Sequence, residues 1–349
     1  METKEFLMEI VSLNGVSGFE QPVQDAVEKH FSPLVDEIRR DALGNLIMLK
    51  KGCGKDRPRV MLAAHVDEIG LMVTRVDERG FVRFAAVGGV DQRTLPGQEV
   101  IIHGMADVLG VIGQKPPHLM SPKEREKTVP MDELYIDTGL SPDRLKEQVS
   151  SGDPITLRRK PTEMQGMITG KAMDDRAGTA VLFEVLKELA RMNHWVDVYA
   201  VSTTQEEVSL GGAITSTYGI MPDLGIAVDV THGDMQGVPE HKTYALDKGP
   251  VITQGGNIHP AIYQGLLKMA QDRSLPYQTE VAPGPTGTDA WAMQISRAGV
   301  PTGLVSIPLR YMHTSVETLA LKDVINAGRL LAYFLASIDP DFMEGLKWS

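Results

Sequence analysis

The chain of 349 residues contains a single cysteine, Cys53. One cysteine cannot form an internal disulfide, which fits a reducing cytoplasm, and it excludes a metal site built only from thiolates. No apolar run approaches the ~18 residues of a membrane-spanning helix, and the amino terminus, METKEFLMEIVSLNG, lacks the basic start and long apolar stretch of a signal peptide. These absences predict a soluble, unprocessed, cytoplasmic protein that does not bind membranes.

Positive charge is also scarce. Lys and Arg number 35 against 46 Asp and Glu, which gives a net charge of −11 at pH 7. A chain of this charge repels polyanions, so nucleic-acid binding is not expected. The hydrophobic content of 42% is ordinary for a globular protein, and the length suffices for one large domain or two smaller ones.

Helical and strand-like patterns alternate in the outer parts of the chain. The run RVMLAAH, at 59–65, is apolar on both faces, as in a central strand of a covered sheet. The segment DDRAGTAVLFEVLKELARM, at 174–192, has apolar residues at helical spacing with charged residues opposite. It is followed by VDVYAVST at 196–203 and LGIAVDV at 224–230. This order predicts an α/β fold, with a mixed sheet flanked by helices on both faces.

Residues 70–163 differ, because helical patterns almost vanish there. Short β-rich runs, among them GLMVTRV, FVRFAAV, EVIIHG, VLGVIG and PITLRR, are separated by Gly, Pro and Asp turns. This pattern is typical of a small all-β barrel or sandwich. We therefore expect a discontinuous catalytic α/β domain formed by residues 1–69 and 164–349, with an inserted all-β domain at 70–163. Exposed β surface favours partner contact as the purpose of the insert.

Five short stretches place acidic residues or histidine where an apolar run ends. Strand ends followed by loops are where open α/β sheets hold their functional sites, so we expect these stretches to converge. The stretches are AAHVDEIG with His65 and Asp67, GKAMDDRAG with Asp174 and Asp175, TTQEEVSLGG with Glu206 and Glu207, AVDVTHG with Asp229 and His232, and LRYMHTSVET with His313.

A set of two imidazoles and several carboxylates suits Zn²⁺, Co²⁺ or Mn²⁺. Two ions would need a shared ligand, because such sites hold their metals roughly 3.5–4 Å apart. With Asp174 as the bridge, Asp229 and Glu207 as terminal carboxylates and one hydroxide, the negative charges would balance two divalent ions. A site close to neutral is tolerated in a sheltered cleft.

The neighbours Glu206 and Glu207 are expected to have different roles. Side chains of adjacent residues point about 100° apart on a helix, or to opposite faces of a strand. One glutamate can therefore bind an ion while the other faces the water as general base. Asp67 lies two residues after His65, close enough to accept a hydrogen bond from the imidazole and orient the ring.

Each of these residues also has a structural interpretation. A single histidine in a strand is often a structural residue, and an acid at a helix start, such as Asp174 or Asp175, is a common N-cap. Asp229 also fits a strand end, and a turn is the favoured interpretation of His232. The metal-site hypothesis depends on the combination of residues and on no single one of them.

Together, HVDEIG, KAMDDRAG, QEEVSLGGA, DVTHGD and RYMH resemble the dinuclear metallo-aminopeptidases that include the tetrahedral TET particles, deblocking aminopeptidases and glutamyl aminopeptidases. The match runs in order over nearly the whole chain. It implies a zinc-peptidase-like domain interrupted by a small β domain that mediates self-association, with dimers building a dodecamer. It also implies that some relatives carry the label endoglucanase.

The resemblance further implies a role for each candidate residue. Glu206 would be the general base, and Asp67 would orient His65. The two ion sites would be His65, Asp174 and Asp229 for one, and Asp174, Glu207 and His313 for the other.

We therefore expect an aminopeptidase that removes residues from peptides with a free amino terminus, using two divalent ions to activate water. The ligand carboxylates favour the amino end, because they can receive an α-ammonium group. Alternatives are a carboxypeptidase, a deacylase or an endoglucanase, although a glycosidase needs two facing carboxyls about 5–9.5 Å apart and no metal. A non-enzymatic assembly protein would have no need of the base and ligand set.

The side-chain pocket is expected to be lined by PGPTGTDAW, at 283–291, and IPLRYMH, at 307–313. Arg310 lies in the second segment. It would either favour acidic substrate residues or form a structural salt bridge. The preferred amino-terminal residue is therefore left open by the sequence.

Overall fold

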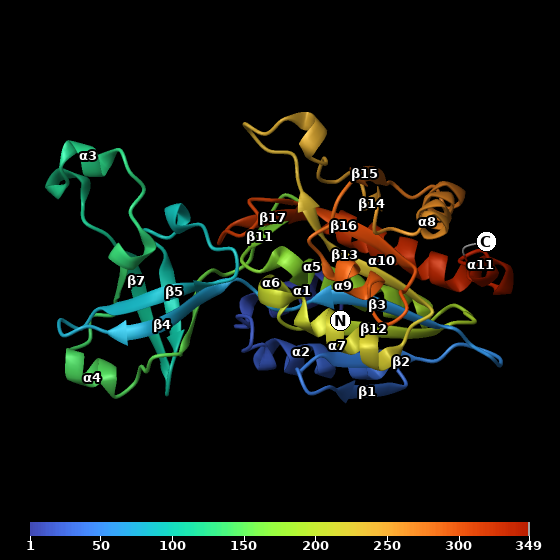
Figure 1. Cartoon of the computed structure of the whole chain (residues 1–349), viewed down its shortest axis with the longest axis horizontal. Coiled ribbons are helices and arrows are strands. Elements are labelled where there is room, and N and C mark those ends of the chain that lie inside the picture. Colours follow the sequence, from blue (N-terminus) through green and yellow to red (C-terminus); the bar gives the residue numbers. More distant parts are fainter. Residues whose placement is uncertain (348–349) are drawn as a thin grey trace.

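The computed structural model describes residues 1–347 and consists of a large α/β body with a β-barrel projecting from one side (Figure 1). The fold class expected from the sequence is confirmed. The main sheet contains 11 strands. Along its main path these are β1 (Glu37–Arg40), β2 (Leu46–Lys50), β12 (Asp197–Thr203), β3 (Arg59–His65), β13 (Leu224–His232), β16 (Thr302–Arg310), β17 (Glu317–Ala320), β11 (Met167–Gly170) and β10 (Thr162–Met164), with β14 (Val251–Gly255) on β16 and β15 (Gln278–Ala282) on β14.

Four central strands of this sheet run parallel. β3 pairs in parallel with β12 on one side and β13 on the other, and β13 pairs in parallel with β16. The carboxyl ends of these strands therefore meet at one edge of the sheet. The side chains of β3 are buried on both faces of the sheet, as the apolar run RVMLAAH predicted.

Helices cover both faces of the sheet. The helices α1 (Thr3–Ser12), α2 (Gln21–Phe31), α5 (Met173–Leu189), α8 (Pro260–Asp272) and α10 (Leu321–Ser337) form one layer, while α7 (Gly211–Ile220) and α9 (Asp289–Gln294) pack together on the opposite face. Two glycines distinguish the faces, since a Cβ on Gly303 would meet Ile262 of α8 and one on Gly225 would meet Met293 of α9. The short helices are α6 (Glu206–Ser209) and α11 (Pro340–Glu344).

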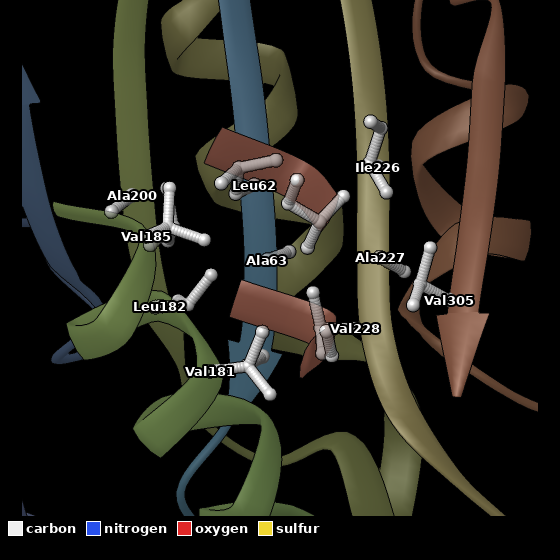
Figure 2. Close-up of a cluster of buried hydrophobic side chains, with 14 of the residues drawn as sticks. Leu62, Ala63, Val181, Leu182, Val185, Ala200, Ile226, Ala227, Val228 and Val305 are labelled. Atoms are coloured by element: carbon white, nitrogen blue, oxygen red, sulfur yellow. The ribbon is translucent and has the colours of Figure 1, made fainter. Parts of the chain in front are cut away.

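The core lies between α5 and the parallel strands. Figure 2 shows Val181, Leu182 and Val185 of α5 facing the strands that carry Leu62 and Val228. All five side chains are at most 1% exposed. Burial of each contributes about 1.5–3 kcal/mol, so this interface fixes α5, and with it Asp174 at its first turn, against the strand ends.

The inserted barrel is a separate unit with its own hydrophobic core. It closes in the order β4 (Gly70–Val76), β5 (Val82–Val87), β8 (Tyr135–Asp137), β7 (Asp107–Gly113), β6 (Glu99–His103) and β9 (Pro154–Leu157), with short helices α3 (Pro122–Arg125) and α4 (Pro142–Lys146) in its loops. All of its strand pairs are antiparallel. The expected division of the chain at 69/70 and 163/164 stays a prediction.

Within residues 1–347, no helix combines the length and the apolar composition required to cross a membrane.

Candidate metal centre

The five acidic and histidine-containing stretches lie together at the carboxyl edge of the parallel strands. His65 ends β3, Asp229 lies near the end of β13, and His313 follows β16. Glu206 and Glu207 open α6 directly after β12. The remaining carboxylate, Asp174, comes from the first turn of α5. Parallel pairing thus gathers residues that lie far apart in the sequence.

Asp174 lies between the two histidines. Its Oδ1 is 3.2 Å from Nε2 of His65, and its Oδ2 is 3.2 Å from Nε2 of His313. Glu207 joins from one side, with Oε1 3.4 Å from the same His313 nitrogen. Each oxygen of Asp174 therefore lies next to a different imidazole, and a carboxylate that bridges two ions requires this arrangement.

Two groups of side chains have ligand atoms close enough together to hold an ion. One consists of His65, Asp174 and Glu207, and the other of His65, Asp175 and Asp229, with ligand atoms within 4.8 Å of one another in each group. The sequence offered Asp175 as a candidate beside Asp174, but neither of the expected ion sites included it. One of its oxygens accepts a hydrogen bond from the Gly178 amide, while Oδ2 is buried without a partner among the described residues.

The acidic groups of the centre repel one another in a buried environment. Burial, reinforced by Asp229 and opposed by His65, raises the pKa of Glu206 to about 10. Burial is also the main cause that raises the pKa of Asp229 well above its usual value. Hydrogen bonding to Asp174 and Glu207 raises the pKa of His313 to about 11. Bound cations would offset this crowding of buried carboxylates, and the donor set fits divalent ions that accept both imidazole and carboxylate.

Asp67 connects His65 to the helix that carries the glutamate pair. Its Oδ1 is 3.5 Å from Nδ1 of His65 and accepts a 3.0 Å hydrogen bond from the Glu206 amide. Its Oδ2 accepts hydrogen bonds from the Glu207 amide, at 3.2 Å, and from the Ser17 hydroxyl, at 2.6 Å. The expected hydrogen bond from His65 to the Asp67 carboxylate stays a prediction, because Nδ1 of His65 lies closer to the Asp67 backbone carbonyl oxygen, at 3.2 Å. Nothing in the sequence indicated the backbone contacts to α6.

Two further acidic residues support the centre and were missed by sequence reasoning. Glu317 accepts hydrogen bonds from the amides of His313, at 2.8 Å, and Asp174, at 3.2 Å. Asp289 accepts a 2.6 Å hydrogen bond from Thr203, and burial raises its pKa to about 6. Glu317 follows the candidate ligand His313 within the stretch LRYMHTSVET, and that closeness was the available signal. Asp289 lies in PGPTGTDAW, which contains no candidate ligand, so the sequence contained no comparable signal for it.

The ring of His313 is oriented by the barrel. Its Nδ1 lies 3.0 Å from the carbonyl oxygen of Gly89, in the loop that follows β5. An N–H on Nδ1 that donates to this carbonyl leaves Nε2 free to bind an ion. The inserted domain therefore contributes a backbone group to the centre.

Two residues with open interpretations lie outside the centre. Arg310 donates from Nη2 to Oδ1 of Asp234 at 2.7 Å, so the structure favours the salt-bridge interpretation. His232 is exposed at the end of β13 and belongs to neither group of candidate ligands.

The chain is a member of the M42 glutamyl aminopeptidase family, whose model matches residues 44–330. M42 peptidases are metallopeptidases.

A relative with a named activity spans nearly the whole chain. It is a lysyl aminopeptidase of Pyrococcus furiosus, 35% identical over 96% of this chain and 97% of its own length. Family and relative together support aminopeptidase activity.

Similar solved structures include peptidases of the TET type. A TET aminopeptidase from a Thaumarchaeota archaeon has a TM-score of 0.94 at 32% identity, with 99% of each chain covered. A Pyrococcus horikoshii TET1 peptidase that can assemble into a tetrahedron or a large octahedral shell has a TM-score of 0.85 at 29% identity, covering 97% of this chain and 100% of its own. A Thermotoga maritima protein described as an endoglucanase has a TM-score of 0.79 at 32% identity, covering 98% and 99%. The expectation that some relatives carry the label endoglucanase is thus confirmed.

Proposed function

We propose that this chain is a dinuclear metal-dependent aminopeptidase of the cytoplasm that removes single residues from peptides with a free amino terminus. Two divalent ions, Zn²⁺, Co²⁺ or Mn²⁺, would polarise the peptide carbonyl and activate a water molecule. Glu206 would act as general base. As the family resemblance implies, the ions would be held by His65, Asp174 and Asp229 on one side and by Asp174, Glu207 and His313 on the other. Asp175 is an additional candidate, because its ligand atom groups with those of His65 and Asp229.

The position of Asp174 between the two histidines carries this proposal. Each of its oxygens lies 3.2 Å from a different imidazole nitrogen. A carboxylate that only capped α5 would direct its oxygens to amides of the first helical turn. Here the α5 backbone is instead bound by Glu317, which accepts from the amides of Met173 and Asp174.

Glu206 fits the role of the base. Its Oε2 lies 3.8 Å from Nε2 of His65, outside hydrogen-bonding distance but at the edge of the centre. Asp67 holds the Glu206 amide, which fixes the start of α6 and the direction of the side chain. Glu206 would take a proton from the attacking water and deliver it to the leaving amine.

The charges near the centre favour the amino end of a peptide. A carboxypeptidase needs a free cation for the terminal carboxylate, and Arg310, the cation nearest to His313 in the sequence, is paired with Asp234. The surplus of carboxylates suits an α-ammonium group instead. This distribution of charge supports the amino end over the carboxyl end.

The decisive experiment compares metal-depleted protein with protein reloaded with Zn²⁺, Co²⁺ or Mn²⁺. We expect hydrolysis of aminoacyl-anilides after reloading and none after chelation. Amino-terminally acetylated anilides serve as the control and should resist cleavage. Metal-independent hydrolysis of a soluble cellulose derivative, with no anilide cleavage, would support the endoglucanase alternative and overturn the proposal.

We also propose that the barrel mediates self-association, by dimers that build a dodecamer. On β7 the outward-facing Leu109 and Val111 are 56% and 48% exposed. Apolar residues on the outer face of a barrel favour contact with a partner. The shells formed by the TET1 peptidase support assembly as the purpose of the insert.

A further inference from the structure

We propose that Glu280 is a specificity-determining residue that binds the cationic side chain of an amino-terminal lysine or arginine. This inference rests on the proposed aminopeptidase function and names the substrate class of the same site. The names of the family and its members do not decide the matter, because the family is called glutamyl aminopeptidase while the relative from Pyrococcus furiosus is a lysyl aminopeptidase.

The strand register places Glu280 on the same face of the sheet as Asp229. Asp229 pairs with Ser306, and Ser306 pairs with Val251. Thr253 lies two residues after Val251 and pairs with Glu280. Paired residues project to the same face, and side chains alternate along a strand. Asp229 and Glu280 therefore project to the same face of the sheet, the face covered by α9.

Two threonine hydroxyls hold the carboxylate of Glu280 in place. Thr253 donates to Oε2 at 3.0 Å, and Thr231 makes a longer contact to Oε1 at 3.5 Å. Thr231 is two residues after Asp229 on β13, and Thr253 is 1% exposed. The carboxylate of Glu280 on β15 is thus held by one threonine from β13 and one from β14, and the β13 threonine lies two residues after Asp229.

The distance suits a long basic side chain. Two residues along a strand span about 6.6 Å, so Glu280, which contacts Thr231, lies one such step beyond Asp229. Asp229 is one of the carboxylates proposed to face the substrate's α-ammonium group. A lysine anchored there could extend its flexible four-carbon stem along β13 to the carboxylate.

Glu280 has no cationic partner within the described chain. None of the ion pairs formed by residues 1–347 includes it, and Arg310, at the end of β16, is paired with Asp234. A half-buried carboxylate that only hydroxyls contact keeps acceptor capacity for a cation. An acidic substrate side chain would instead meet a like charge.

Tyr244 lies next to the end of β13, where its backbone forms a bridge with Gly233. Burial and the negative charge of Glu280 raise the pKa of its phenol. Its amide donates to the carbonyl oxygen of His232 at 2.9 Å, which holds the segment against the end of β13.

The test measures kcat and KM of the reloaded enzyme for lysyl, leucyl and glutamyl anilides. Glu280→Gln keeps the size of the side chain and an oxygen acceptor for the threonines. We expect it to lower kcat/KM for the lysyl substrate by about 10- to 100-fold, the usual effect of losing a hydrogen bond to a charged group. The loss should fall mainly on KM, with the leucyl substrate nearly unchanged.

Two further variants make the result specific. Glu280→Asp keeps the charge and should retain more lysyl preference than Glu280→Gln. Glu78→Gln, in an exposed turn of the barrel, is the matched control and should change nothing. Equal losses on lysyl and leucyl substrates, or no loss on either, would overturn the inference while leaving aminopeptidase activity intact. A wild-type enzyme inactive on every anilide would instead refute the proposed function.

Discussion

At the scale of single residues, the two adjacent glutamates have different surroundings. Glu207 contacts His313 at 3.4 Å, whereas Glu206 is 3.8 Å from His65. The amides of both residues are held by Asp67. One glutamate therefore fits a ligand and its neighbour a base. Their adjacency in the sequence indicated only that the two differ, and the family resemblance implied that Glu206 is the base.

Glu206→Gln tests the role of the base. The variant should retain both ions, because Glu206 belongs to neither of the two proposed ligand sets and its Oε2 lies 3.8 Å from the nearest imidazole nitrogen, on His65. Turnover should fall on the order of 10²–10⁴-fold, the usual contribution of a general base. Elemental analysis and anilide kinetics on the same sample check both halves. Loss of metal from this variant would show that Glu206 is a ligand.

Asp174→Asn tests the bridge. The amide keeps the size of the side chain but removes the charge that both ion sites share, so binding at both sites should weaken together. His313→Ala should weaken mainly one site. Calorimetric titration of metal-depleted protein measures the two affinities, and an Asp174→Asn protein with two wild-type sites would place the bridge elsewhere.

The metal-depleted protein should lose stability as the pH rises. Glu206 has an ordinary pKa of 4.5 and a folded pKa of about 10, and His313 has an ordinary pKa of 6.5 and a folded pKa of about 11. The folded state therefore binds more protons than the unfolded state across the range from pH 6 to 9, and stability falls as protons become scarce. We expect the Tm of chelated protein to decrease from pH 6 to pH 9. Glu206→Gln should reduce the dependence of Tm on pH. An unchanged dependence would contradict the raised pKa of Glu206 in the folded, metal-depleted protein.

At the scale of elements, the sequence predicted the strands and helices that carry the centre, because burial on both faces and helical spacing are local patterns. β3 coincides with RVMLAAH, and α5 ends at Leu189 inside the predicted segment. The supporting contacts were not predictable in the same way. Glu317 reaches Asp174 only because β17 pairs beside β11, which leads into α5. Such contacts depend on the pairing of distant strands, which one sequence does not specify.

Glu317 should therefore matter as a link between two elements. Its carboxylate accepts the amides of Met173 and His313 at 2.7 and 2.8 Å. Glu317→Ala would leave buried amides without partners, a loss of about 1–3 kcal/mol for each group. We expect a lower Tm and weaker metal binding, with Glu317→Gln affected less because its amide oxygen still accepts. Thermal melts with and without metal measure this, and a Glu317→Ala protein with unchanged metal affinity would limit Glu317 to a packing role.

At the scale of the whole molecule, the barrel should control the size of the particle. Leu109 and Val111 point outwards from β7, away from the barrel core. A Leu109→Arg, Val111→Glu double variant should stay folded, because neither side chain is buried, yet form smaller species. Multi-angle light scattering determines the mass. A wild-type protein that is monomeric at micromolar concentration would refute self-association.

The hydrogen bond between the barrel and the α/β body connects the association of subunits to the metal centre. The Gly89 carbonyl holds the ring of His313 at 3.0 Å, so the orientation of one proposed ligand depends on where the barrel sits. Contacts between subunits that steady the barrel would also steady this imidazole. Dilution could then switch the enzyme off without unfolding it, and binding of metal and association of subunits would be thermodynamically linked, each strengthening the other by the same factor.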